Sequence, residues 1–144
     1  MTVAKILMSK GSAEVVTVPP GTLVSEVARI LSEKRIGTVV VSKNGRTADG
    51  ILSERDIVRE IGRRGQTCLS DRVEDMMTSN ITTCGKADRA DEVLATMTNG
   101  RFRHMPVVED GEMVGLITIG DVVKYRLSEL AMEKDALEGM IMGF

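Results

Sequence analysis

The chain has 144 residues, 42% of them hydrophobic, a size and composition typical of one compact globular unit or two small units sharing a core. A net charge of −2 and the absence of long apolar runs exclude a nucleic-acid binder that relies on bulk charge and a membrane-spanning protein. One histidine and two cysteines without CxxC spacing exclude the usual zinc sites, so we expect Cys68 and Cys84 to be idle thiols in a cytoplasmic protein.

The N-terminal half reads as a lead-in followed by strand, helix, strand, strand and helix. Residues 3–8 form a short amphipathic lead-in, and residues 15–18 form a strand that Pro19-Pro20-Gly21 ends. The next helix has Thr22 as its predicted N-cap and an apolar face made by Leu23, Val27, Ile30 and Leu31. Strands at 38–41 and 50–52 flank Asn44-Gly45 as a hairpin, and a closing helix runs over residues 56–61 to Gly62 and Gly65.

The C-terminal half repeats this order. After a linker at 66–71, residues 73–78 match the first lead-in, and a strand is predicted at 81–84. A helix capped by Asp88 carries Ala90, Val93, Leu94 and Met97 on one face. Strands at 104–108 and 113–117 flank Asp110-Gly111, and Thr17, Glu26 and Arg35 align with Thr83, Glu92 and Arg101. We therefore expect repeats at 1–65 and 66–132, with a helical extension at 133–144.

One motif occurs at the same place in both repeats. Residues 50–57 and 115–122 both read glycine, two aliphatic residues, a hydroxyl residue, two variable residues, aspartate and an aliphatic residue. The first interpretation is a capping box at a helix start, with Ser53 or Thr118 as N-cap and Asp56 or Asp121 at the third helical position. The second is a polar niche in which the aspartate binds the hydroxyls of a sugar. The duplication favours a functional role.

The second closing helix is predicted from Asp121 towards Met140. Val123, Leu127, Leu130, Leu137 and Ile141 follow a three-four spacing that Lys134 interrupts. Two interpretations of this stripe stay open: a surface for a partner subunit, and a frayed amphipathic tail.

The duplicated junctions, the strand threonines Thr17 and Thr83, the strand at 104–108 and the lead-in at 73–78 together resemble a tandem pair of CBS domains, named after cystathionine β-synthase. The resemblance covers about residues 3 to 132, and we expect a stand-alone pair with no other domain attached. It implies an α/β (α+β) module in which two β-α-β-β-α repeats pack with pseudo-two-fold symmetry. It also implies two clefts that bind AMP, ADP or ATP, with NAD or S-adenosylmethionine as further possibilities, and no catalytic cofactor or metal.

The resemblance assigns residues to each cleft. In the favoured cleft it implies Thr17, Thr22, the backbone of Val39 to Val41, His104, Thr118 and Asp121. In the second cleft it implies Thr38, Ser53, Arg55, Asp56, Thr83, Asp88, Met105 and Pro106. The aspartate would hold the ribose diol and strand backbone would meet the adenine. We favour the Asp121 cleft because Gly120 leaves room there and His104 offers a donor, whereas Arg55 precedes Asp56.

The functional prediction is a regulatory module that senses an adenine nucleotide and signals its state to an unidentified protein. The sequence offers no nucleophile–base pair, so we expect no enzymatic activity. The alternative is a ligand-independent interaction module that docks a partner through its C-terminal helix. We expect a homodimer held by the closing helices, whose apolar positions include Ile57, Val58, Ile61, Val123, Leu127 and Leu130.

Overall fold

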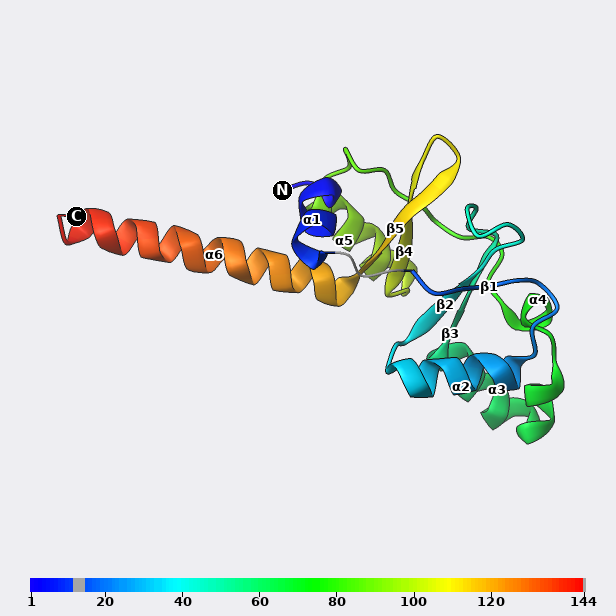
Figure 1. Cartoon of the computed structure of the whole chain (residues 1–144). Helices are drawn as coiled ribbons and strands as arrows, with labels where there is room; N and C mark the ends of the chain where they lie inside the picture. The colour runs from blue at the N-terminus through cyan, green and yellow to red at the C-terminus, as the bar shows by residue number, and fades with distance from the viewer. Residues whose placement is uncertain (12–14, 144) are drawn as a thin grey trace. The chain divides into compact units, whose positions relative to one another are not determined.

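The structure, a computed structural model, describes residues 1–11 and 15–143 in two compact units. One unit comprises Met1–Ala13, Cys84–Met105 and Ile117–Phe144, and the other comprises Glu14–Thr83 and Pro106–Leu116. Helices and small sheets alternate along the chain, which confirms the α/β class (Figure 1). The predicted division of the sequence at residues 65 and 132 stays a prediction.

The unit that contains residues 14–83 is built on a three-stranded sheet in the order β1-β2-β3. Strand β1 (Thr17–Val18) pairs in parallel with the central strand β2 (Thr38–Val41), and β2 pairs antiparallel with β3 (Gly50–Ser53). Every residue of β2 is buried, as expected for β-branched side chains in a central strand. The predicted hairpin is confirmed, whereas the strand predicted at 15–18 is limited to two residues.

Helices complete the core of this unit. They are α2 (Val24–Lys34), α3 (Glu54–Arg64), the 3-10 helix η1 (Gln66–Ser70) and α4 (Val73–Met76). Val27 and Leu31 of α2 pack with Leu52 of β3 and Ile57 of α3 in one cluster of buried side chains. The closing helix is longer than predicted at both ends, and it ends at Gly65, whose φ of 75° suits glycine.

The other unit is mainly helical. It contains α1 (Val3–Lys10), α5 (Ala90–Gly100) and α6 (Ile119–Ile141), and α6 contacts both α1 and α5. Strands β4 (His104–Glu109) and β5 (Glu112–Thr118) pair as a hairpin, whose residues are divided between the two units. Asp110 and Gly111 both have positive φ, as the predicted hairpin turn requires. Figure 1 shows the C-terminal part of α6 running beyond α1 and α5.

Three local predictions are wrong. Residues 81–84 form no strand beyond a single bridge residue at Cys84. Thr22 does not cap α2, because the N-cap residue is Leu23 and the Thr22 hydroxyl donates to the Pro19 carbonyl at 2.7 Å. Asp88 does not cap α5, because the N-cap residue is Arg89 and the Asp88 carboxylate accepts from the Gly85 amide at 2.8 Å.

The starts of α2 and α5 are instead satisfied by backbone from distant lead-ins. The Val24 amide donates to the Asp71 carbonyl, and the Val73 amide of α4 donates to the Thr22 carbonyl. Equivalent bonds join Ala90 to the Met1 carbonyl and Val3 of α1 to the Asp88 carbonyl. Carbonyls from another segment therefore pair the free N–H groups of the first helical turn. As a result, each lead-in packs against the opposite repeat, so α1 belongs with α5 and α6.

Candidate functional site

The duplicated motif forms the same helix start twice. Ser53 is the N-cap of α3 and Thr118 is the N-cap of α6, and each hydroxyl accepts from the backbone N–H of the aspartate three residues later. Each aspartate in turn accepts from the amide of its N-cap residue, at 2.9 Å in both cases. The predicted capping boxes are confirmed. Whether either aspartate also meets a ligand depends on the free acceptor sites that remain.

Asp56 has little acceptor capacity left. Its Oδ2 accepts from both the amide and the hydroxyl of Ser53, and its Oδ1 accepts from Nη2 of Arg59 at 3.0 Å. All these partners lie within three residues of Asp56, and the carboxylate side chain is only 13% exposed. A ligand hydroxyl at this site would have to compete with Arg59.

Asp121 has a different environment. Its Oδ2 accepts from the Thr118 amide and from Nζ of Lys10, at 2.7 Å, so the ion pair joins the end of α1 to the start of α6. Within the described part of the chain, Oδ1 of Asp121 accepts no hydrogen bond from protein groups. The two side chains are 25% and 21% exposed, so the pair lies at the edge of the unit and remains accessible. Among the described residues, one carboxylate oxygen of Asp121 therefore has no protein donor, and a cation lies beside the other.

The backbone places the start of α6 beside the start of β4. The Ile119 amide donates to the Arg103 carbonyl at 3.1 Å, and His104, the next residue, is half-buried in the same unit. The other repeat has the matching bond from Glu54 to the Gly37 carbonyl. Gly120 is exposed, and a β-carbon there would make only an ordinary contact of 3.6 Å with the Thr118 hydroxyl. The structure thus brings Lys10, His104, Thr118 and Asp121 into one unit.

Of the residues predicted for the second cleft, Thr38, Ser53, Arg55 and Asp56 lie in the other unit. Thr38 pairs with Ser53 in the sheet register, and its buried hydroxyl donates to the Leu52 carbonyl at 3.1 Å. Arg55 is exposed and lines a shallow surface hollow with Glu54, Val58 and Arg59. The guanidinium of Arg55 therefore points to solvent from the first turn of α3.

The remaining predicted residues divide between the units. Thr17, Thr22, Val39, Val41, Thr83 and Pro106 lie in the unit with the three-stranded sheet, and Asp88 and Met105 lie in the helical unit. The side chains of Val39, Val41 and Met105 are in the core, so only their backbone can meet a ligand. In β2 the Val40 amide already donates to Val16 and the Val41 carbonyl already accepts from Asp49. A purine edge would have to use other backbone groups of this strand.

Lys10 was not predicted from the sequence as a site residue. The sequence shows only a basic residue in the last turn of a lead-in helix, which is a common stabilising arrangement. Its partner lies 111 positions away, and the contact exists because α1 packs with α6. No local spacing could have revealed this contact.

The basic run of α3 has a structural role. Arg63 and Arg64 both donate to the Glu60 carboxylate at 2.9 Å, and Arg64 also donates to Asp71 at 2.6 Å. The hydrogen bond from Arg64 lowers the pKa of Glu60 below its ordinary value. These contacts hold η1 against the end of α3, so Arg63 and Arg64 form a solvated ion-pair network on the helix face.

The described residues contain no cluster of three histidine, cysteine, aspartate or glutamate side chains able to hold a metal ion. Cys68 and Cys84 are buried, and neither forms a disulfide. No helix in residues 1–11 or 15–143 has the length and apolar character needed to cross a bilayer.

Known proteins resemble this chain in sequence and in fold. The family model for the CBS domain matches residues 3–63 and 73–128. The mitochondrial CBS domain-containing protein CBSX3 of Arabidopsis thaliana is 32% identical over 124 residues, covering 83% of this chain and 60% of the relative, so this chain spans less than two thirds of that protein.

Solved structures agree with this match. A CBS-domain-containing protein from Agrobacterium tumefaciens is 40% identical with a TM-score of 0.83, and the match covers 88% of this chain and 99% of that one. A CBS domain protein from Pyrobaculum aerophilum, solved in complex with AMP, is 27% identical with a TM-score of 0.76, over 92% of this chain and 99% of that one. The duplicated helix starts, the repeated fold and these matches show that the chain belongs to the CBS-domain family, as a tandem pair of CBS domains.

Proposed function

We propose that the protein is a regulatory module that binds an adenosine-containing nucleotide at the start of α6. The observation that carries this proposal is the Asp121 carboxylate, which has one oxygen without a protein partner among the described residues and a lysine ammonium 2.7 Å from the other. A carboxylate accepts well from the two hydroxyls of a ribose. The nearby ammonium of Lys10 offsets its charge, so an anionic nucleotide is not repelled.

AMP, ADP and ATP are the proposed ligands, with NAD and S-adenosylmethionine as further candidates. The AMP complex of the Pyrobaculum protein supports this choice. Thr17, Thr22 and the backbone of Val39 to Val41 are further proposed ligand contacts, in addition to His104, Thr118 and Asp121. Thr38, Ser53, Arg55, Asp56, Thr83, Asp88, Met105 and Pro106 form the proposed second, weaker cleft. A weaker second cleft is consistent with the contact between Arg59 and Asp56.

Calorimetric titration with each nucleotide tests the proposal. We expect binding at micromolar to millimolar concentration, and a ligand at 100 times its dissociation constant should stabilise the fold by about 2.7 kcal/mol. Asp121→Ala should weaken binding at least tenfold, equivalent to about 1.5–3 kcal/mol, and more than Asp56→Ala does. Absence of both heat and a melting shift with all five ligands would refute the proposal. A larger effect of Asp56→Ala would move the main site to α3.

We further propose that the module is a cytoplasmic homodimer that passes its ligand state to another protein and catalyses no reaction itself. The exposed apolar residues of the closing helices support dimerisation: Val58 and Ile61 on α3, and Val123, Leu127 and Leu130 on α6. The prediction that Ile57 contributes to this surface is wrong, because Ile57 is only 5% exposed and packs in the core.

A second candidate function is a ligand-independent module that docks a partner through its C-terminal helix. The exposed apolar side chains along α6 favour this alternative. The titration that tests nucleotide binding also separates the two functions.

A further inference from the structure

The exposed stripe on α6 extends well beyond the part of the helix that packs against α1 and α5. Val123, Leu127, Leu130, Lys134, Leu137 and Ile141 recur at spacings of four and three residues, the a and d pattern of a coiled coil. Leu127 is 62% exposed, and every described residue of α6 from position 130 to 138 is exposed. The only residue of α6 that is fully buried is Val122, which lies outside the stripe.

We propose that this stripe forms an antiparallel two-helix coiled coil with α6 of a second copy, with the two-fold axis near residue 132. This inference rests on the homodimer proposed above and specifies the surface that holds it. In this register Val123 faces Ile141 of the second copy, and Leu127 faces Leu137 of the second copy. The stripe is therefore complementary to itself when reversed, as a two-fold interface requires.

The charges beside the stripe favour the antiparallel orientation. Lys124 and Glu138 flank the stripe on one side, and the reversed helix places Lys124 of one copy beside Glu138 of the other, twice in each dimer. A parallel pair would instead place Glu133 beside Glu138 of the other copy, and like charges in contact destabilise. It would also stack Lys134 on Lys134 in the seam. Antiparallel pairing places Lys134 opposite Leu130, where its aliphatic stem can pack while the ammonium reaches solvent.

One contact opposes this arrangement. Glu133 of one copy would lie close to Glu133 of the other near the axis. Arg126 offsets this repulsion, because its guanidinium lies 3.9 Å from the Glu133 carboxylate on the same helix. The antiparallel pair therefore has two attractive contacts and one compensated repulsion. The parallel pair has two Glu133–Glu138 repulsions, offset by Arg126 and by Lys134, which lies 3.8 Å from Glu138, and it gains no attractive contact between the copies.

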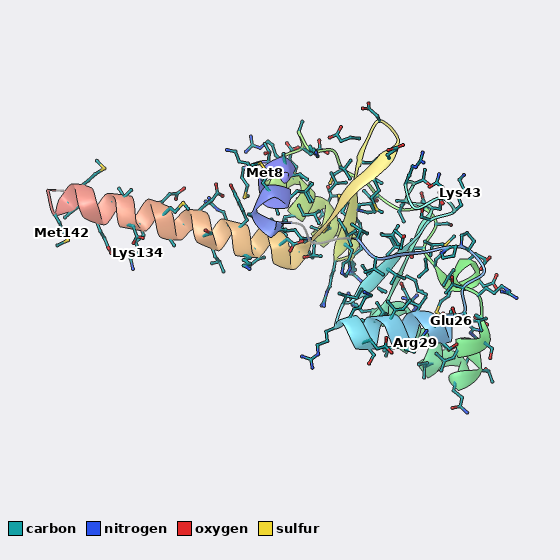
Figure 2. All side chains as sticks on the ribbon, in the orientation of Figure 1. Met8, Glu26, Arg29, Lys43, Lys134 and Met142 are labelled. Carbon is teal, nitrogen blue, oxygen red and sulfur yellow. The ribbon has the colours of Figure 1, made fainter. Side chains whose placement is uncertain are left out.

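The interface also has a length that suits a coiled coil. Residues 123 to 141 span about 27 Å at 1.5 Å per residue and supply six successive seam positions. Figure 2 labels Lys134 and Met142 on this projecting part of α6, where neighbouring side chains extend away from the helix.

Spin labels on α6 test the orientation directly. The variants Ala131→Cys and Met142→Cys are labelled in the full chain, whose own cysteines are buried. For the antiparallel pair, pulsed EPR should give a short distance at position 131 and a separation of about 30 Å along the axis at position 142. Short distances at both positions would show a parallel pair, and long or absent distances at both would show that the stripe is not the interface. Either result overturns the proposal.

Charge reversal gives an independent test by sedimentation equilibrium. Glu138→Lys should raise the dimer dissociation constant roughly three- to tenfold, and Lys124→Glu in the same chain should restore it. Asp135→Lys is the matched control, because Asp135 is exposed and is neither a seam residue nor one of the residues that directly flank the seam, so this change should leave dimerisation unchanged. In a parallel pair Glu138→Lys would instead tighten the dimer by meeting Glu133. Neither test uses a nucleotide, so failure here leaves the proposed ligand site standing.

Discussion

Replacing Lys10 by methionine tests whether the ion pair with Asp121 holds the start of α6. Methionine keeps most of the aliphatic stem, so the variant removes the ammonium and little packing. Hydrogen bonds to charged groups contribute about 1.5–3 kcal/mol, and fully exposed ion pairs about 0.2–1 kcal/mol. About three quarters of each side chain is covered here, so the Lys10–Asp121 pair lies between a hydrogen bond to a charged group and a fully exposed ion pair. We therefore expect Lys10→Met to lower the free energy of unfolding by roughly 1–2 kcal/mol.

Arg59→Met is the matched control in the other repeat. Arg59 pairs with Asp56, but its side chain is 58% exposed, so its loss should cost no more than about 0.5 kcal/mol. Thermal unfolding followed by circular dichroism measures both variants. A cost of 1 kcal/mol corresponds to a fall of about 2–4 °C in Tm for a chain of this size.

A double-mutant cycle then isolates the ion pair. Asp121→Asn keeps an oxygen for the capping box but removes the charge, so Lys10→Met should cost much less in that background. High salt should reduce the coupling only partly, because the pair is mostly covered. The reasoning is refuted if Lys10→Met is no more harmful than Arg59→Met, or if its cost is unchanged in the Asp121→Asn background.

Two further predictions concern the other unit. Gly50→Val should destabilise the fold by about 1–3 kcal/mol, as measured by urea unfolding, because a β-carbon at Gly50 would overlap the Met77 side chain. Gly62→Val is the control: no atom lies close to a β-carbon at Gly62, so this variant should be less destabilising. Arg64→Met should raise the pKa of Glu60 towards its ordinary value, as NMR titration can show. Because folding lowers the pKa of Glu60, its contribution to stability is present above its unfolded pKa and is lost as the pH falls through the folded value. An unchanged pKa of Glu60 in the Arg64→Met variant would contradict this account.

Features set by neighbouring residues were predictable from the sequence. The capping boxes at Ser53 and Thr118 depend on groups three residues apart, and the turn at Asp110-Gly111 depends on two adjacent residues. The repeat itself could be read because both copies keep the spacing of these local signals. Together with the resemblance to CBS domains, these signals gave the fold class and the two aspartates of the candidate site.

Features set by distant segments were not predictable. Thr22 and Asp88 were suitable capping residues. The amides at the two helix starts instead donate to the carbonyls of Asp71 and Met1, which belong to distant segments of the chain. The ion pair between Lys10 and Asp121 has the same origin, because it requires α1 to pack with α6. Local propensity predicted most of the helices and strands but not the absence of a strand at 81–84, and tertiary contacts decided which partner each polar group found.

The two repeats have the same capping box at a helix start, but the basic residue that pairs with the aspartate comes from a different place in each repeat. This difference suggests different roles for the two aspartates. The partner of Asp56 comes from the next turn of its own helix, so the α3 site depends on one element. The partner of Asp121 comes from α1, so a ligand that engages Asp121 acts on the contact between α1 and α6. Helix α6 has 23 residues, and it continues from this contact to Ile141 along the stripe that we assign to a second copy. A shift at Asp121 would therefore be carried along α6 to the proposed dimer seam, whereas α3 ends within about three turns at Gly65.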